Sequence, residues 1–228
     1  MKYFLDSAKM DEIKEAYEYL GIDGVTTNPK HIMNSGKPFK KAIEDIAKWT
    51  EDQGFKSWKD FPVSVEIDPW LEDCDKILPM AREISKISPC FVIKIPSVYG
   101  GLKAARILEK EGIRTNLTLV FSPAQAILPA KAGCLFVSPF IGWKESNGED
   151  CKKYIQDIVD IYRNYGYLRK TEIIAAAIRT PKQIADCAVA GCDIVTCGLD
   201  VYKDSIKHPY TVQGLGTFRD AWDNTAKE

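Results

Sequence analysis

The sequence predicts an α/β fold, a single-domain (β/α)8 barrel over residues 1–228 with an extra helix at the C-terminus. Two observations support this prediction. Short apolar runs alternate with longer amphipathic stretches, and several runs are apolar almost throughout, as in parallel strands covered by helices. Eight such pairs in 228 residues fit a compact TIM barrel, and no linker or low-complexity segment divides the chain.

The predicted strands are short runs of apolar and β-branched residues. In chain order they span residues 2–7, 24–27, 62–67, 90–96, 115–121, 135–141, 172–178 and 193–198. In a barrel, the carboxyl ends of the strands line the active site. Polar residues near these ends are therefore the candidates for chemistry.

Helical patterns lie between the strands, most clearly at residues 9–21, 72–88, 100–112 and 180–191. The first pattern places Ile13, Ala16 and Tyr17 on one face, and the last begins with a threonine cap followed by proline. The tail after the eighth strand, residues 199–228, contains a further helical pattern at 214–227 that could dock on a neighbouring subunit.

An open, doubly wound sheet is the alternative fold. Its usual marker is a G-x-G-x-x-G turn after the first strand, and that turn is missing. The nearest match, "GLGTFR" at 214–219, lies near the C-terminus and lacks the third glycine. The barrel is therefore the favoured prediction.

The overall charge argues against broad binding to nucleic acid or to an anionic membrane. The chain has 31 basic and 32 acidic residues, so it has no excess of positive charge for such a surface. No apolar run approaches the roughly 18 residues needed to span a bilayer. The N-terminus acquires acidic residues at once and does not resemble a signal peptide.

Cysteine and histidine usage narrows the chemistry. Seven cysteines, an odd number without a C-x-x-C pair, favour a reducing cytoplasm over a disulfide scaffold. Only two histidines occur, His31 and His208, and neither belongs to a motif with zinc-ligand spacing. No G-x-S-x-G turn indicates a serine hydrolase. The sequence therefore predicts no metal and no cofactor.

Polar residues near the predicted strand ends form one candidate site. They are Asp6, Thr26, Asn28, Glu66, Lys94, Asn116, Thr118, Ser138 and Arg179. Each has a structural explanation when taken singly; Asp6 could cap the following helix, for example. Because all of them fall at the same face of the predicted barrel, a shared functional site is the better explanation.

Lys94 is the most informative of these residues, because it interrupts the apolar strand "FVIKIP". One interpretation is a buried ion pair with Glu66 on the adjacent strand. The other is an amine with a pKa lowered by burial, which attacks a ketone as the free base. The protonated imine would then act as the electron sink and take the place of a metal. From the residues alone both interpretations remain open.

Seven segments resemble, in order and spacing, the small-type transaldolases and their fructose-6-phosphate aldolase relatives. They are "FLDSA", "DGVTTNP", "VEI", "FVIKIP", "GIRTNLTLVFSPAQA", "AGCLFVSPFIG" and "IIAAAIRTP", from about residue 2 to about residue 200. The resemblance implies a Schiff base on Lys94 and an acid/base role for Asp6. It also implies that Asn28 and Asn116 hold hydroxyls of a bound dihydroxyacetone unit.

Within this resemblance, Glu66 and Thr118 would position a catalytic water that relays protons. The aldolases have glutamine at the position of Glu66 and tyrosine at the position of Phe140, so both residues match the transaldolases. A phenol near the carbanion would assist its protonation and release. Without that phenol, the enamine would persist until an acceptor aldehyde arrives.

The chain also departs from the family where a sugar phosphate is expected to bind. Trp143, followed by Lys144, replaces an arginine, and Ala177 replaces a serine, whereas Arg179 remains. Losing a charge-assisted contact costs on the order of 1.5–3 kcal/mol. The pocket is therefore expected to suit another terminal group, flanked by Trp143, Lys144, Arg179 and by His31 or Asn34.

One branch of the family shares the patterns "NPxHIMNSGKPF" and "SPFxGWKE", namely the 6-deoxy-6-sulfofructose transaldolases. This resemblance implies transfer of a dihydroxyacetone unit from the sulfonated ketose to glyceraldehyde 3-phosphate. An ordinary transaldolase, a fructose-6-phosphate aldolase, or an inactive barrel that binds a sugar acid are the alternatives. The family resemblance further implies a homo-oligomer, a pentamer or decamer, with small sugars as the only other partners.

Overall fold

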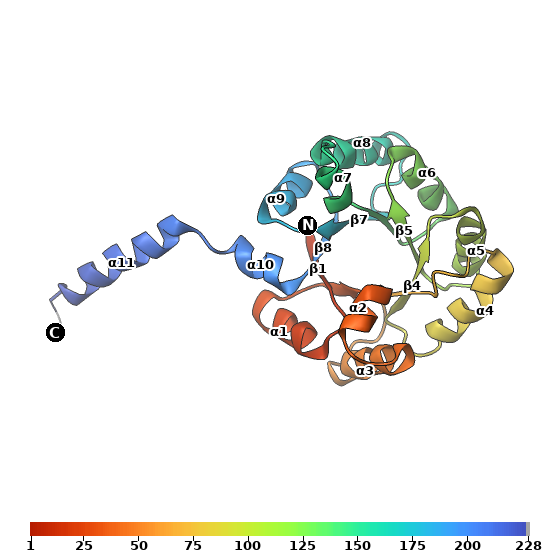
Figure 1. Ribbon diagram of the computed structural model, residues 1–228, viewed down its shortest axis with the longest axis horizontal. Coiled ribbons are helices and arrows are strands. Elements are labelled where there is room, and N and C mark those ends of the chain that lie inside the picture. Colours follow the sequence, from red (N-terminus) through yellow and green to blue (C-terminus); the bar gives the residue numbers. More distant parts are fainter. Residues whose placement is uncertain (227–228) are drawn as a thin grey trace.

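The computed structural model describes residues 1–226, and its eight strands form one closed parallel barrel in chain order (Figure 1). The strands are β1 (Lys2–Asp6), β2 (Gly24–Thr26), β3 (Val63–Glu66), β4 (Phe91–Pro96), β5 (Thr115–Val120), β6 (Phe136–Pro139), β7 (Glu172–Ile178) and β8 (Ile194–Cys197). Each lies inside the range predicted for it. The predicted (β/α)8 barrel is therefore confirmed.

Helices surround the barrel as an outer ring, with one exception at the C-terminus (Figure 1). They are α1 (Met10–Leu20), α2 (Pro29–Asn34), α3 (Phe39–Asp52), α4 (Cys74–Ser85), α5 (Tyr99–Lys110), α6 (Pro123–Ala132), α7 (Gly142–Ser146), α8 (Cys151–Asn164), α9 (Pro181–Val189), α10 (Leu199–Ser205) and α11 (Pro209–Asp223). Helices α6 and α9 each begin with a capping box, at Ser122 and Thr180.

A small apolar cluster fills one end of the barrel interior. It comprises Phe4, Val92, Leu135, Phe136, Ile174 and Ile194, and the rings of Phe4 and Phe136 meet edge to face at 5.8 Å. Side chains along a strand alternate between its two faces, so the second residue after an inward one also points inward. This alternation brings Asp6, Lys94 and Ser138 to the opposite, carboxyl end of the same interior.

Two strands carry a residue in the left-handed backbone region, Leu119 (φ 59°) in β5 and Ala177 (φ 57°) in β7. At both places the pairing register with the next strand shifts. Such a conformation costs on the order of 1–3 kcal/mol for a residue with a side chain. Both residues line the pocket at the carboxyl end of the barrel, so the strain is concentrated where the strands meet the candidate site.

The predicted tail divides into two different parts. Helix α10 packs on the barrel through Leu199, Val201 and Tyr202, and the Tyr202 hydroxyl donates to the carbonyl of Phe4 at 2.7 Å. It therefore belongs to the ring of helices around the barrel, although the sequence placed it in a tail after the eighth strand. Residues 227 and 228 of that tail lie outside the described residues.

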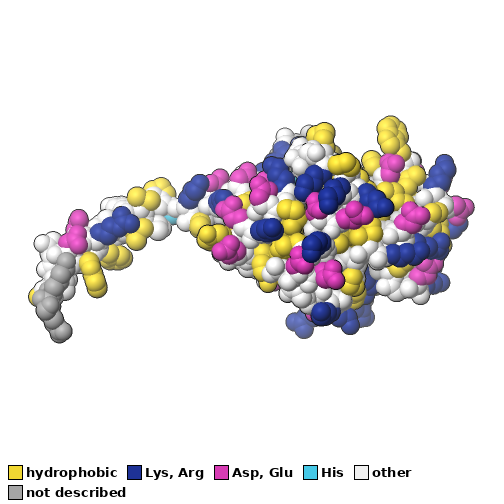
Figure 2. Space-filling model, turned by 90° about the horizontal axis from the view of Figure 1, so that it is seen from below, with side chains coloured by type: hydrophobic (Ala, Val, Ile, Leu, Met, Phe, Trp, Pro, Cys, Tyr) yellow, Lys and Arg dark blue, Asp and Glu magenta, His cyan; other side chains and the backbone are white. Residues whose placement is uncertain are grey.

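Helix α11 is the extra helix, and it extends away from the barrel (Figure 1). None of its residues is buried. Its apolar side chains lie along the exposed helix in Figure 2 and include Val212, Leu215, Phe218 and Trp222. Within residues 1–226, every helix is too short or too polar to cross a membrane.

Candidate active site

A pocket of about 580 Å³ opens at the carboxyl end of the barrel. Most of the residues predicted to form the site line it, namely Asp6, Thr26, Asn28, His31, Asn34, Glu66, Lys94, Ser138, Phe140, Trp143 and Arg179. Three others, Asn116, Thr118 and Lys144, do not line it. The structure thus brings residues from distant parts of the chain to one concave surface, as the barrel prediction requires.

Lys94 lies at the base of this pocket and is only 3% exposed. Its Nζ is 3.1 Å from Oε2 of Glu66 and donates a hydrogen bond to the carbonyl of Thr27 at 3.0 Å. The two charged residues are register partners on β3 and β4. A buried ammonium without such partners would be very costly, and here a carboxylate is in place to accept its proton.

Asp6, at the end of β1, has a donor on each carboxylate oxygen. The Thr26 hydroxyl donates to Oδ1 at 2.7 Å, and Nε2 of His31 is 3.1 Å from Oδ2. Burial by itself would raise the pKa of Asp6, but the hydrogen bond and charge of His31, together with the charge of Lys94, lower it below its ordinary value. Asp6 is thus held as a carboxylate inside the pocket.

Asn28 has a structural task as well as a place in the pocket. Its Oδ1 accepts from the backbone N–H of His31 at 3.0 Å and so caps α2. This cap fixes the start of the helix that carries His31 and Asn34. The Asn28 side chain therefore both caps a helix and lines the pocket.

Asn116 and Thr118 on β5 are fully buried behind the pocket wall. The Asn116 amide donates to the Ser64 hydroxyl at 3.0 Å and accepts from the Ser138 hydroxyl at 2.7 Å. The Thr118 hydroxyl has no hydrogen-bond partner among the described residues. Leaving a buried hydroxyl unpaired costs about 1–3 kcal/mol, which favours a site where a water or substrate hydroxyl completes the pairing.

An aromatic wall faces the pocket on the side of β6. Phe140 lies within the range predicted for this strand, but it follows the last residue of the observed β6 and forms an isolated bridge with Ala176. Its ring lies 5.4 Å from Phe121 and 5.6 Å from Trp143, the latter in an edge-to-face contact. Trp143 remains 55% exposed, so its indole is available to a ligand.

Arg179 provides a cation at the pocket mouth. Its guanidinium donates to the Ser146 hydroxyl at 3.1 Å and has no carboxylate partner within residues 1–226. The absence of a side chain at Gly142 leaves room for the Arg179 side chain and for the carbonyl oxygen of Ala177. A Cβ at Gly142 would lie 2.3 Å from the carbonyl oxygen of Ala177 and 3.0 Å from Nε of Arg179.

Lys144 does not share this position with Arg179. Its Nζ pairs with Glu149 and lies 4.9 Å above the ring of Tyr154, away from the pocket lining. Neighbouring residues of a helix point about 100° apart, and on α7 Trp143 lines the pocket whereas Lys144 does not. The placement therefore does not support the predicted contact between Lys144 and a substrate.

The pocket lining also includes residues that were not among the predicted site residues, and these include Lys30, Leu119, Thr196 and Asp200. Thr196 could have been found, because it follows the inward Ile194 by two positions in a predicted strand. Its hydroxyl lies 2.6 Å from that of Thr26, which in turn donates to Asp6. Lys30 and Asp200 lie on helices whose orientation no local sequence pattern indicates.

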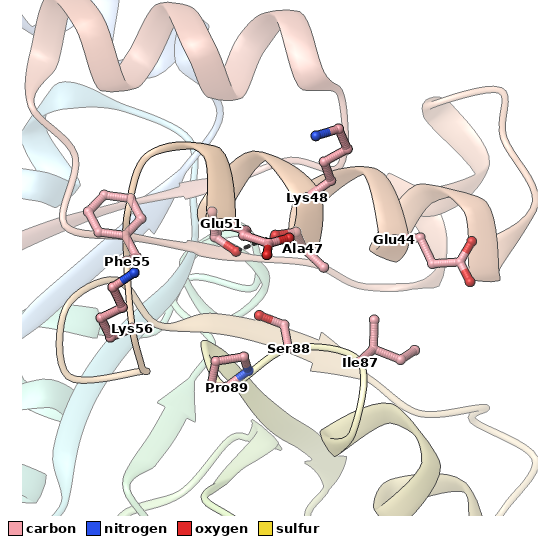
Figure 3. A pocket seen from close by; sticks show the side chains of 10 residues that line it. Glu44, Ala47, Lys48, Glu51, Phe55, Lys56, Ile87, Ser88 and Pro89 are labelled. Carbon is pink, nitrogen blue, oxygen red and sulfur yellow. Dashed lines mark hydrogen bonds between the residues drawn. The ribbon is translucent and has the colours of Figure 1, made fainter.

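A second pocket, of about 490 Å³, lies between α3 and the segment before β4 (Figure 3). Charged side chains of Glu44, Lys48 and Glu51 border one side of it, and Ser88 and Pro89 border the other. Because Ser88 precedes β4 at its amino end, this pocket lies away from the strand ends that carry Lys94. It therefore contains none of the candidate catalytic or binding residues described above.

Comparison with known proteins identifies the family of the chain. The family model of transaldolase/fructose-6-phosphate aldolase matches residues 3–228. The chain is 57% identical over 228 residues to the 6-deoxy-6-sulfo-D-fructose transaldolases of Priestia aryabhattai and Priestia megaterium, covering 100% of this chain and 98% of each relative. It is 44% identical to a probable transaldolase of Dictyoglomus turgidum, covering 100% of both chains.

A solved structure described as "Native KDPGal structure" covers 97% of this chain with a TM-score of 0.56 and 19% identity, which supports the fold alone. The family model and the full-length relatives show the family of the chain, which the similarity in fold does not. The chain is therefore an enzyme that belongs to the transaldolase/fructose-6-phosphate aldolase family.

Proposed function

We propose that this enzyme is a Schiff-base transaldolase that moves a dihydroxyacetone unit from 6-deoxy-6-sulfofructose to glyceraldehyde 3-phosphate. The products are 3-sulfolactaldehyde and fructose 6-phosphate. The observation that carries the proposal is the buried Lys94 amine in the pocket, 3.1 Å from the carboxylate of Glu66. The identity to the two Priestia enzymes supports the choice of donor sugar.

The first step forms the imine. Glu66 accepts a proton from Nζ of Lys94, and the free amine attacks C2 of the ketose. A carbon–nitrogen bond forms, and the C2 oxygen leaves as water after it has been protonated. The unpaired hydroxyl of Thr118 supports a water in this part of the site, which would carry protons between Glu66 and the substrate oxygen.

The second step breaks the C3–C4 bond. Asp6 accepts the proton of the C4 hydroxyl, and the electron pair of the breaking bond moves into the protonated imine. The products are a neutral enamine on Lys94 and the free aldehyde. The acceptor aldehyde then reverses this step, and Asp6 returns its proton to the new hydroxyl, so no proton is gained or lost over the transfer.

The fate of the enamine separates transfer from simple cleavage. Phe140 has no hydroxyl, and the side chains that it contacts, Phe121 and Trp143, also lack an acidic proton to give to a carbanion. The enamine is therefore protected from protonation and waits for an aldehyde. A fructose-6-phosphate aldolase would instead release dihydroxyacetone without any acceptor.

The terminal group of the donor binds, in this proposal, at the pocket mouth. Arg179 supplies a cation without a competing carboxylate among residues 1–226, and the exposed indole of Trp143 supplies an N–H donor. A sulfonate carries one negative charge, whereas a phosphate dianion requires more compensation. Lys30 and Asn34 line the same mouth from α2 and are available to the terminal group or to the acceptor phosphate.

We also infer that the enzyme is a homo-oligomer. Helix α11 exposes Val212, Leu215, Phe218 and Trp222 on a helix with no buried residue, and a second copy of the chain is the partner that would cover them.

The seven cysteines are all buried and unpaired, which supports the expected reducing cytoplasm.

The direct test of the donor and acceptor is a transfer assay. The enzyme is incubated with 6-deoxy-6-sulfofructose and glyceraldehyde 3-phosphate, and both products are followed by mass spectrometry. We expect 3-sulfolactaldehyde and fructose 6-phosphate to form in equal amounts. Release of dihydroxyacetone in the absence of an acceptor would identify an aldolase. Transfer from fructose 6-phosphate to an acceptor, without transfer from 6-deoxy-6-sulfofructose, would identify an ordinary transaldolase.

A further inference from the structure

His31 contacts the carboxylate of Asp6, although the two residues come from different elements. Nε2 of His31, on α2, lies 3.1 Å from Oδ2 of Asp6, at the end of β1. The backbone N–H of His31 is held by the Asn28 cap, which fixes the base of the side chain. The His31 side chain is 25% exposed and that of Asp6 is 16% exposed, so the contact lies between the pocket and solvent.

We propose that His31 is a positioning residue for Asp6, which keeps that carboxylate ionised and oriented for removal of the C4-hydroxyl proton. The proposal rests on the proposed Schiff-base function, because Asp6 acts as a base only in that reaction. His31 was expected to bind the terminal group of the sugar. The contact with Asp6 gives it a task at the reacting carbons instead.

The donors on Asp6 explain why this histidine matters. The Thr26 hydroxyl occupies Oδ1 with a neutral donor, so it orients the carboxylate and adds no positive charge. His31 donates to Oδ2 and adds positive charge whenever its ring is protonated. Burial favours the protonated carboxyl, and the pKa of Asp6 falls below its ordinary value because of His31, Lys94 and Thr26. Without His31, more of the enzyme would begin the reaction with Asp6 already protonated and unable to act as a base.

Other charged groups near His31 do not replace it. Lys9 pairs with Glu12 at 3.0 Å in a recess that Asp6, His31 and Asp200 also line, so these two charges offset one another. Asp200, from α10, is negative and would oppose ionisation of Asp6. Lys30, on α2 beside His31, lines the pocket but forms no ion pair with Asp6. Lys94, on β4, becomes part of the imine during the proposed reaction and is then no longer a free ammonium.

The test compares the pH dependence of kcat/KM for transfer in the full-length enzyme and in three variants. His31→Leu removes both the donor and the charge. His31→Gln keeps an Nε2 donor at nearly the same place and removes only the charge. His208→Asn changes the other histidine, which caps α11 away from the pocket, and asparagine can keep that cap.

We expect the acid limb of the profile to move to higher pH by about one unit in His31→Leu, with about a tenfold loss of kcat/KM at pH 6. The limb should move less in His31→Gln and stay in place in His208→Asn. An acid limb that coincides in the unmodified enzyme, His31→Leu and His31→Gln would overturn the proposal. If His31→Leu does not fold, the position of the limb in His31→Gln alone decides.

Borohydride trapping with dihydroxyacetone separates this proposal from the proposed function. Dihydroxyacetone forms an imine without any C4-hydroxyl proton to remove, so Lys94 should be trapped equally well in the unmodified enzyme and in His31→Leu. Absence of trapping in the unmodified enzyme would contradict the Schiff-base function itself. Equal trapping with an unmoved acid limb would contradict only the role of His31.

Discussion

Nζ of Lys94 and Oε2 of Glu66 lie 3.1 Å apart because their residues are direct register partners on β3 and β4. The sequence left open whether Lys94 is a structural ion-pair partner or a nucleophile, and the geometry shows that these two interpretations are compatible. A buried pair that loses one partner is destabilised by about 3–5 kcal/mol. In the proposed mechanism the same carboxylate receives the proton that frees the amine.

Activity is expected to be independent of metal ions. Within residues 1–226, no three His, Cys, Asp or Glu side chains come together in a way that could hold an ion. Transfer rates should therefore be unchanged after prolonged treatment with a chelator in excess. Loss of turnover that zinc or magnesium restores would contradict this prediction.

Phe140→Tyr is expected to shift the enzyme from transfer toward cleavage. The added phenol would lie in the pocket beside Trp143 and could protonate the enamine before an aldehyde captures it. The measurement is the rate of dihydroxyacetone release without acceptor, divided by the rate of transfer. Phe121→Tyr is a matched control, because it adds the same hydroxyl to the neighbouring ring of the cluster. A ratio that stays flat or falls in folded Phe140→Tyr would count against the proposed role of Phe140.

The double change Trp143→Arg with Ala177→Ser is expected to move donor preference toward fructose 6-phosphate. The introduced guanidinium would add a second cation beside Arg179, and a serine tolerates the left-handed backbone of Ala177 about as well as alanine does. For the unmodified enzyme we expect about a tenfold preference for the sulfonate, or about 1.4 kcal/mol. The measurement is kcat/KM for both ketoses with one acceptor. An unmoved ratio would remove the basis for the sulfonate assignment.

Gly142→Ala is expected to destabilise the pocket mouth, because its Cβ would lie 2.3 Å from the carbonyl oxygen of Ala177. Overpacking of this kind costs about 1–3 kcal/mol and should lower Tm by several degrees. The displaced α7 should also raise KM for the donor, since Trp143 and Arg179 move apart. Gly216→Ala on α11 is the control, because nothing lies within 4 Å of that Cβ. Equal Tm values for the two variants would contradict the expected clash.

The fold was predictable because hydrophobic periodicity records which face of each strand is buried. Phe4 and Asp6, or Val92 and Lys94, alternate along one strand and so enter the same interior. This pattern is local and can be read without knowing the tertiary structure. The C-terminal tail was less predictable, because whether α10 packs on the barrel depends on contacts such as that of Tyr202 with the carbonyl of Phe4.

The site was predictable where strand ends determine position and less so where helices do. Lys94 and Glu66 follow from strand register alone. By contrast, the contact of His31 with Asp6 depends on how α2 is seated, and Lys144 faces Tyr154 because of the rotation of α7. Asn116 was placed on the correct strand, but its burial behind Ser64 and Ser138 reflects side-chain packing that no spacing pattern encodes.

The most direct test of the central claim is borohydride trapping followed by mass analysis of the modified peptide. The enzyme and Lys94→Met are each incubated with 6-deoxy-6-sulfofructose and reduced. We predict that a dihydroxyacetone-derived mass is added to the peptide that contains Lys94 in the unmodified enzyme, and that no label is found in Lys94→Met. Labelling that persists in a folded Lys94→Met, or that falls on another lysine, would contradict the account.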